Sequence, residues 1–406
     1  MKGLIHRLKD DISNLLAVWA YEMKLTVKDE GVLIFFILAP LLYPLLYSWI
    51  YNNEVVREVP VAIVDMSHSS SSRQFIRLCD ASPEVEVKYY CNNLPEAQEL
   101  IGRQVVKGIL YFPHDFAENI VNGDQAHVSV FCDMSLMLAY KAIYQTATSV
   151  SQEMNGDIQI EKSGGFTDRD DELTIKPLDY EEVEIFNSTG GYGNYLLPGV
   201  LILVIQQTLV LGIGLANGTN RERKRYGHLI RYNVHGNGLM VIVLGKALCY
   251  FMIYSVISAY LTLLLPKMFS YTILATPLSL AGLLLPYILA CIFFSMTLST
   301  FVRYRENIIL LFVVTSILFL FLSGISWPRN NIPAFWQGVS WLIPSTFGVR
   351  GYITINCMGG TISDISADIV ALWIQAIVYF FFSCLLYHVE ISKAEKSLTE
   401  ENNPDK

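Results

Sequence analysis

Charged residues are scarce in this chain of 406 residues. Asp, Glu, Lys and Arg make up 16% of it, whereas hydrophobic residues make up 52% and the mean hydropathy is +0.38. An ordinary soluble domain carries about 25% charged residues. The composition therefore excludes an ordinary soluble protein and indicates an integral membrane protein.

Motifs of several catalytic and metal-binding classes are also missing. The chain has no GxSxG turn, no HExxH and no CxxC, and its His residues are scattered. The nearest approach to a nucleotide-binding P-loop, residues 238–247, has six residues in place of four between its glycines and ends in Gly-Lys-Ala. We therefore expect no catalytic residues, no metal site and no nucleotide site, so that this chain is not itself an enzyme.

Six apolar runs are long enough to cross a bilayer. A helix rises 1.5 Å per residue, so about 20 residues cross a hydrocarbon core of roughly 30 Å. In the first run we expect Pro40 and Pro44 to kink or locally unwind the helix, and in the fourth we expect Pro277 and Pro286 to break it. The runs are residues 31–51, 194–218, 238–265, 271–302, 308–325 and 369–387.

Two basic segments predict the orientation of these spans. The loop 219–237 contains Arg221, Arg223, Lys224, Arg225 and Arg231, and a second basic turn follows the fourth run at residues 303–305. Because short loops rich in Lys and Arg stay in the cytoplasm, both segments are expected there, which places both termini in the cytoplasm. The loop cations either only set this topology or also bind a cytoplasmic partner.

The two ends of the chain are predicted to be cytoplasmic segments. Residues 1–30 place apolar side chains at three- and four-residue steps between charged ones, which predicts an amphipathic helix on the cytoplasmic membrane face, with Lys24 and Lys28 at the headgroups. We expect residues 1–30 to contain no cleavable signal, because no small-residue cleavage site follows a short apolar core. Residues 391–406 form a charged tail. Lys246, near the cytoplasmic end of the third run, is expected to extend to the headgroups.

Residues 52–190 have a different pattern. Short strand-like runs at 61–65, 85–90, 108–112 and 128–132 alternate with helical segments, which predicts an α/β domain with a mainly parallel sheet. Residues 178–186 could add a strand. An acidic excess favours an external location, although long loops cross largely regardless of charge. A serine run, Ser67–Ser72, either binds an anion or, more simply, caps a helix. The sequence leaves the disulfide state of Cys79, Cys91, Cys132 and Cys357 open.

Polar and Pro-rich positions mark the remaining membrane segments. Gln206 and Gln207 lie within the second span, where they either hydrogen-bond to other helices or contact a substrate. Residues 326–365 are apolar but interrupted by Pro and Gly, so they are expected to form short external re-entrant or interfacial helices. The sequence thus predicts an α-helical protein with six transmembrane helices and an external α/β domain inserted between the first two.

Four regions of the chain resemble the ABC-2 type exporter permeases, in the drug-exporter-like branch with a large external domain after the first helix. The first stretch is EMKLTVKDEGVLIFFILAPLLYPLLYS. The second comprises VPVAIVDMSHSSSSRQFIRLC and KGILYFPHDFAENIVNGDQAHVSVFCD. The third is NSTGGYGNYLLPGVLILVIQQTLVLGIGLANGTNRERKRYG, and the fourth is LSGISWPRNNIPAFWQGVSWLIPSTFGVRGYI. They follow one another in this order between residues 22 and 353, a range that takes in most of the chain.

The resemblance implies a permease subunit in the inner membrane of a bacterial cell, paired with a second copy or a paralogue. A separate ATPase subunit would bind ATP and Mg, and an amphiphilic or hydrophobic substrate such as a drug, lipid or peptide would move outward. A periplasmic adaptor protein could bind the external domain, and no nucleic acid is involved. The implied ATPase-coupling residues are Arg221, Arg223, Lys224, Arg225, Arg231, Lys24, Lys28 and Asp29. The implied substrate pathway contains Gln206, Gln207, Pro40 and Pro44, and the external re-entrant segment contains Pro328, Pro333, Pro344 and Arg350.

Other classes of protein fit the residues less well. A membrane-anchored receptor or scaffold would use the α/β domain to bind a partner, and no ATPase would co-purify with it. A membrane-embedded enzyme would need convergent nucleophiles or carboxylates in the spans. A secondary transporter would show inverted repeats and intramembrane charges, and neither is evident in the sequence.

Overall fold

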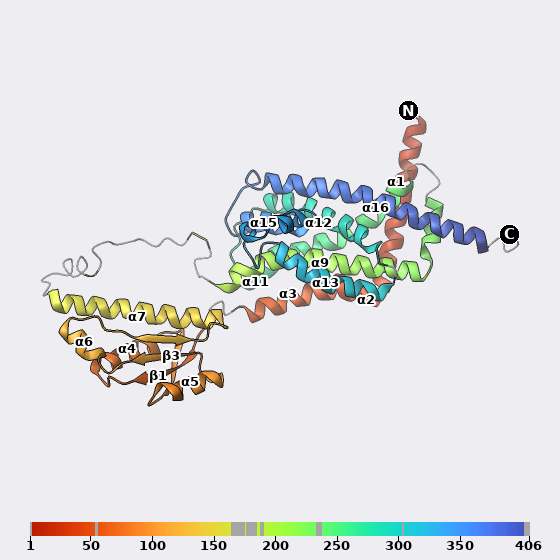
Figure 1. The fold of residues 1–406 in the computed structure, drawn as a ribbon. Helices are drawn as coiled ribbons and strands as arrows, with labels where there is room; N and C mark the ends of the chain where they lie inside the picture. The colour runs from red at the N-terminus through yellow and green to blue at the C-terminus, as the bar shows by residue number, and fades with distance from the viewer. Residues whose placement is uncertain are drawn as a thin grey trace. The chain divides into compact units, whose positions relative to one another are not determined.

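The computed structural model describes residues 2–52, 56–163, 175, 185–186, 191–232, 238–302 and 304–401. The chain divides into two compact units: unit 1 comprises Met1–Asn52 and Ile185–Lys406, and unit 2 is Asn53–Glu184 (Figure 1). Residues 178–184 of the strand considered at 178–186 lie outside the described part of the chain, and residues 185–186 are not in a strand.

Unit 1 is a helical bundle. Six of its helical segments are long and apolar enough to cross a membrane, which confirms the six predicted spans. The first span combines α2 (Glu30–Leu33), η1 (Ile34–Leu38) and α3 (Ala39–Ile50), and the third combines α10 (Gly238–Ala259), η3 (Tyr260–Leu264) and α11 (Leu265–Met268). The others are α9 (Tyr192–Glu222), α12 (Pro277–Ser299), α13 (Arg305–Leu322) and α16 (Ser366–Glu401).

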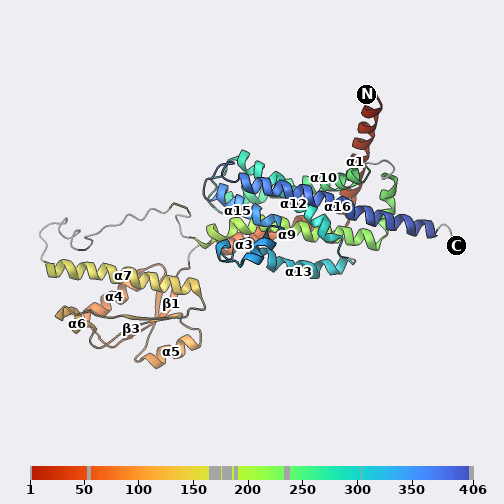
Figure 2. The same ribbon diagram turned by 45° about the horizontal axis from the view of Figure 1, so that its top comes forward.

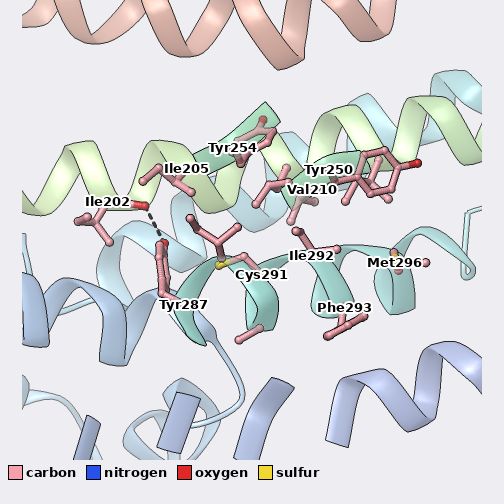
Figure 3. Packing of buried hydrophobic residues seen from close by; sticks show 14 of the residues in the cluster. Ile202, Ile205, Val210, Tyr250, Tyr254, Tyr287, Cys291, Ile292, Phe293 and Met296 are labelled. Carbon is pink, nitrogen blue, oxygen red and sulfur yellow. Dashed lines mark hydrogen bonds between the residues drawn. The ribbon is translucent and has the colours of Figure 1, made fainter. Parts of the chain in front are cut away.

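Helix α9 is the centre of unit 1. Of its most apolar stretch, 89% is buried, against 17% for α13. Helices α3, α12, α13 and α15 all pack against it. Glycines allow this close packing, since a Cβ at Gly212 would collide with the ring of Phe36 and one at Gly214 with Ile308. Figure 3 shows the buried side chains between α9, α10 and α12.

Proline distorts the spans less than expected. The first span contains a π-helical turn, η1, in which the Ala39 N–H donates to the Ile34 carbonyl, and it remains helical through Pro40 and Pro44. The Tyr260 hydroxyl donates to the Leu41 carbonyl at 3.2 Å, so a neighbouring helix supports this backbone. The expected break in the run 271–302 is found at Pro277, because residues 271–276 are not helical and Pro277 is the first residue of α12, where a fixed φ suits a helix. The expected break at Pro286 is wrong, since the helix continues through it.

The segment 326–365 contains three short helices. They are η4 (Arg329–Asn331), α14 (Ala334–Ser340) and α15 (Pro344–Asn356), and each is too short to cross a bilayer. Pro328 and Pro333 directly precede η4 and α14, while Pro344 is the first residue of α15. Helix α15 is largely buried against α9, α12 and α16.

Unit 2 is built on a four-stranded sheet in the order β2-β1-β3-β4. Strands β1 (Val59–Asp65), β2 (Val85–Tyr90) and β3 (Gly108–Phe112) are parallel, and β4 (Ser129–Cys132) is antiparallel to β3. All four coincide closely with the strand-like runs of the sequence. Figure 2 shows α4 (Ser70–Ala81) and α7 (Met137–Ser163) on one face and α5 (Leu94–Gly102) on the other.

The two faces of this sheet have separate cores, which bears on the cysteines. Cys79 belongs to the core beneath α4 and α7, and Cys91 to the core beneath α5. Both thiols are free, as are those of Cys132 and Cys357. A bridge from Cys79 to Cys91 would have to pass through the sheet, so this pairing is excluded.

Candidate coupling site in unit 1

The N-terminal helix α1 (Lys2–Lys28) packs against α10. Val18, Glu22 and Thr26, spaced at four-residue steps, are buried. Gly245 of α10 permits the contact, because a Cβ there would lie 2.9 Å from both the Leu15 carbonyl oxygen and the Cβ of Val18. One face of α1 is thus covered by a membrane span, and its location on the cytoplasmic membrane surface stays a prediction.

A buried ion pair joins α1 to α10. Lys246 Nζ lies 3.0 Å from Glu22 Oε1, and the two side chains are 1% and 2% exposed. The Tyr250 hydroxyl also donates to Glu22 Oε1 at 2.5 Å. The expected extension of Lys246 to the headgroups is wrong, because this carboxylate and its hydrogen bonds offset the cost of burying the ammonium.

Asn217 of α9 connects this pair to two further spans. Its Oδ1 accepts from the Tyr387 hydroxyl of α16 at 2.9 Å and from Lys246 Nζ at 3.5 Å. Its Nδ2 donates to Ser299 Oγ of α12 at 2.7 Å. We call these six residues the buried polar cluster: Glu22, Asn217, Lys246, Tyr250, Ser299 and Tyr387.

Arg221, predicted to contact an ATPase, binds within the protein. Its Nε lies 3.2 Å from Glu390 Oε2, and its Nη1 donates to the carbonyls of Ser299, at 3.0 Å, and Val302. The side chain is 11% exposed. Arg221 thus fastens the end of α9 to α12 and α16, at the end of unit 1 where α1 also lies (Figure 1).

Asp29 forms a second ionic connection. Its carboxylate lies 2.8 and 3.2 Å from the two terminal nitrogens of Arg305, and it accepts from the Thr219 hydroxyl at 3.1 Å. It also caps α2 by accepting from the Val32 N–H. Burial alone would raise the pKa of Asp29, but the hydrogen bonds and the charge of Arg305 hold it below its ordinary value. Asp29 therefore joins the first, second and fifth spans.

The other predicted coupling residues are more accessible. Lys24 and Lys28 of α1 are exposed, as are Arg223 and Lys224 just after α9. Arg225 is half-buried and lines a small cavity with Glu22 and Asp29, among others. Arg231, in η2 (Arg225–Tyr232), lies over the Tyr232 ring. The ring of Tyr21 stacks on that of His228 at 4.3 Å, which joins α1 to η2.

The two membrane glutamines bond to other helices. The Oε1 of Gln206 accepts from the backbone N–H of Ser345, at the start of α15, at 2.6 Å. The Nε2 of Gln207 donates to the Ser316 carbonyl of α13 at 3.2 Å. In the same region Tyr287 donates to the Ile202 carbonyl (Figure 3). The structure thus supplies a helix partner for one polar atom of each amide, whereas Gln206 Nε2 and Gln207 Oε1 are buried without a hydrogen bond. Contact of either glutamine with a substrate stays a prediction.

The remaining predicted positions also have structural partners. Pro40 and Pro44 lie in a buried stripe of the first span, which packs on α9. Arg350 of α15 donates through Nε to Asp368 Oδ1 of α16 at 2.7 Å, and Asp368 is 5% exposed. In unit 2, the serine run caps α4: Ser69 and Ser72 form a capping box, and Ser72 donates to Asp65. The helix-cap interpretation of the run is confirmed.

Sequence reasoning missed most of the buried polar cluster. It noticed Lys246 but not its partner Glu22, which lies 224 positions away. Asn217 had the same signal as the glutamines, an amide within a span, and could have been found by it. Within the described ranges, no group of three or more His, Cys, Asp or Glu side chains could hold a metal ion.

Six membrane-length helices with polar connections between them define a multi-pass membrane protein. Residues 31–385 match the family described as ABC-2 family transporter protein. This match covers most of the chain, so the chain belongs to that family and is a permease of the ABC-2 type. No match was found among curated proteins.

Proposed function

We propose that this chain is the permease subunit of an ATP-driven exporter that moves an amphiphilic or hydrophobic substrate, such as a drug, a lipid or a peptide, outward. The family is one of membrane transport components and implies a partner ABC ATPase. The observation that carries the proposal is the buried polar cluster, which connects α1 to α9, α10, α12 and α16. Such a connection allows a force on α1 to reach four spans.

The proposed binding surface for the ATPase consists of the exposed cations of α1 and of the turn after α9. Lys24, Lys28, Arg223 and Lys224 are its members. The separate ATPase subunit binds ATP and Mg, and its two nucleotide states prefer different positions of α1 and η2. Nucleotide thereby shifts the balance between two arrangements of the spans. Arg221 and Asp29 act inside the permease, where their ion pairs and hydrogen bonds hold neighbouring spans together.

The proposed assembly contains two permeases, identical or paralogous. In this assembly the two subunits meet at α3 and α13, which both expose apolar side chains such as Leu46 and Val314 along most of their length. Substrate moves along these faces between the two subunits. The membrane is the inner membrane of a bacterium, and unit 2 lies on its outer side. In a cell with two membranes, unit 2 binds an adaptor protein. Both termini are cytoplasmic.

The experiment that tests the ATPase partner is co-purification of tagged protein from its native membranes. We expect an ATPase subunit with vanadate-sensitive hydrolysis to elute with the wild-type chain. The double variant Lys24→Glu/Arg223→Glu should lose the ATPase subunit. Both side chains are exposed, and the two substitutions reverse the charge of the proposed binding surface. Arg103→Glu, which reverses an exposed arginine of unit 2, is the matched control and should retain it.

Two results would count against this proposal. Retention of the ATPase by the double variant would refute the binding surface while leaving the exporter itself standing. A wild-type chain that elutes alone from several mild detergents, without hydrolysis, would instead favour a receptor or scaffold whose α/β unit binds a partner.

A further inference from the structure

The turn between β4 and α7 exposes four large apolar side chains. Met134, Leu136, Met137 and Leu138 are 59%, 43%, 64% and 43% exposed. Exposed apolar residues scattered singly are normal on protein surfaces, whereas a contiguous group marks a contact surface. We call residues 134–138 the apolar turn.

The shape of the apolar turn is fixed by polar groups. Asp133 Oδ1 accepts from the Ser135 N–H at 3.0 Å and from its hydroxyl at 2.6 Å. The Leu136 N–H then donates to the Asp133 carbonyl at 3.3 Å. The bonds from Ser135 also lower the pKa of Asp133. The turn is thus held by hydrogen bonds of the backbone and of Asp133 and Ser135, while the apolar side chains remain accessible.

Strand register places the apolar turn at one end of the sheet, where strands begin or finish. Gly108, the first residue of β3, pairs with Val61 of β1 and with Cys132, the last residue of β4. The ladder continues beyond it, because the Asp133 N–H donates to the Lys107 carbonyl at 3.0 Å and the Lys107 N–H to that of Pro60 at 2.8 Å. The apolar turn therefore lies at the end of the sheet where β1 and β3 begin.

The segment that connects the first span to unit 2 reaches the sheet at this same end. The first span ends at Ile50 and β1 begins at Val59, so residues 51–58 connect them. At no more than about 3.5 Å per residue, eight residues reach at most roughly 30 Å. The start of β1, at the end of the sheet that holds the apolar turn, can therefore be no farther than roughly 30 Å from the end of the first span.

We propose that the apolar turn inserts into a lipid surface. The segments that flank this end of the sheet carry charges of both signs, since Arg103, Lys141 and Glu58 are exposed and Asp133 is half-buried. Insertion therefore depends on burial of the Met and Leu side chains rather than on attraction to anionic lipids. The inference requires only that α3 spans the membrane, and it is independent of the ATPase partner and of the substrate.

The test measures lipid contact in the full-length chain. The partly exposed cysteines are first replaced by Ala; they are Cys132, Cys357 and Cys384. The amount of spin label that binds to this background variant, without an introduced cysteine, is then measured. A spin label is then attached at Met137→Cys or Leu138→Cys in vesicles of phosphatidylcholine with or without phosphatidylglycerol. The matched control is Val121→Cys, an apolar residue that is 80% exposed and follows the opposite end of β3.

We expect labels at 137 and 138 to be accessible to oxygen and shielded from an aqueous nickel complex, in both lipid mixtures. The label at 121 should show the reverse. Aqueous behaviour at all three positions would overturn the inference. Shielding of 137 and 138 from both oxygen and nickel would also overturn it, because it would indicate that protein, such as a second copy of the chain, covers the turn. Dependence on phosphatidylglycerol would refute the apolar mechanism.

Discussion

Glu22 and Lys246 are buried as charges between α1 and α10, where each needs the other. Taking either ion out of water costs several kcal/mol, and only the partner charge and its hydrogen bonds offset that cost. Glu22 has two such partners, the Lys246 ammonium and the Tyr250 hydroxyl. The pair therefore fixes how α1 sits on α10 more than it adds to stability.

Removal of one charge should harm the protein more than removal of both. Lys246→Met leaves a buried, unpaired carboxylate, so we expect a loss of about 3–5 kcal/mol in the free energy of unfolding. The double variant Glu22→Gln/Lys246→Met should recover much of that loss. Unfolding by denaturant in detergent micelles measures both. If the single and double variants unfold alike, the pairing argument does not hold.

The ion pair of Asp29 predicts a dependence on pH. Its pKa is lowered in the folded protein, so its stabilising contribution is complete above the unfolded value and is lost as pH falls through the folded one. We expect Asp29→Asn to lower the thermal midpoint equally from neutral pH down to about 5, and progressively less below about 4. Asp157→Asn, at an exposed position of α7, should change the midpoint little throughout. An Asp29→Asn effect that grows on acidification would contradict the assignment.

At the scale of elements, glycine decides which helices approach closely. Gly245 brings α10 against the backbone of α1, whereas Gly282 in α12 has only one atom, of Ile362, within 4 Å of its hypothetical Cβ, at 3.8 Å. Composition does not separate these two glycines, since both lie in apolar spans. The sequence therefore could not predict which helix covers α1.

Alanine at these two glycines should have opposite consequences. Ala favours a helix over Gly by about 1 kcal/mol, so Gly282→Ala should be neutral or stabilising. Gly245→Ala should destabilise, because its Cβ would meet the Leu15 carbonyl oxygen and α1 would have to move away. Thermal unfolding, together with protease sensitivity of α1, distinguishes them. Equal behaviour of the two variants would show that α1 does not depend on this contact.

Across the whole molecule, the sequence predicts elements well and their partners poorly. The six spans follow from the length of apolar runs, and β1 and β3 follow from short apolar runs that are buried in the sheet. Strand β2 follows from its β-branched and aromatic residues, although most of them are not buried. Lys246 shows the limit. Its position suggested an extended side chain, but the decisive neighbour, Glu22, is distant in sequence and is brought close only by tertiary packing. The central place of α9 was likewise not visible from its composition.

The hydrogen bond from Ser345 to Gln206 also has a consequence for biosynthesis. Ser345 is translated 139 residues after Gln206, so α9 enters the bilayer long before the start of α15 exists. Until then the Gln206 carbonyl oxygen, which is fully buried in the finished protein, lacks its backbone donor. Nascent chains that stop short of Ser345 therefore hold this oxygen only through the weak donor Cys291 Sγ of α12, at 3.9 Å, once that helix has been made.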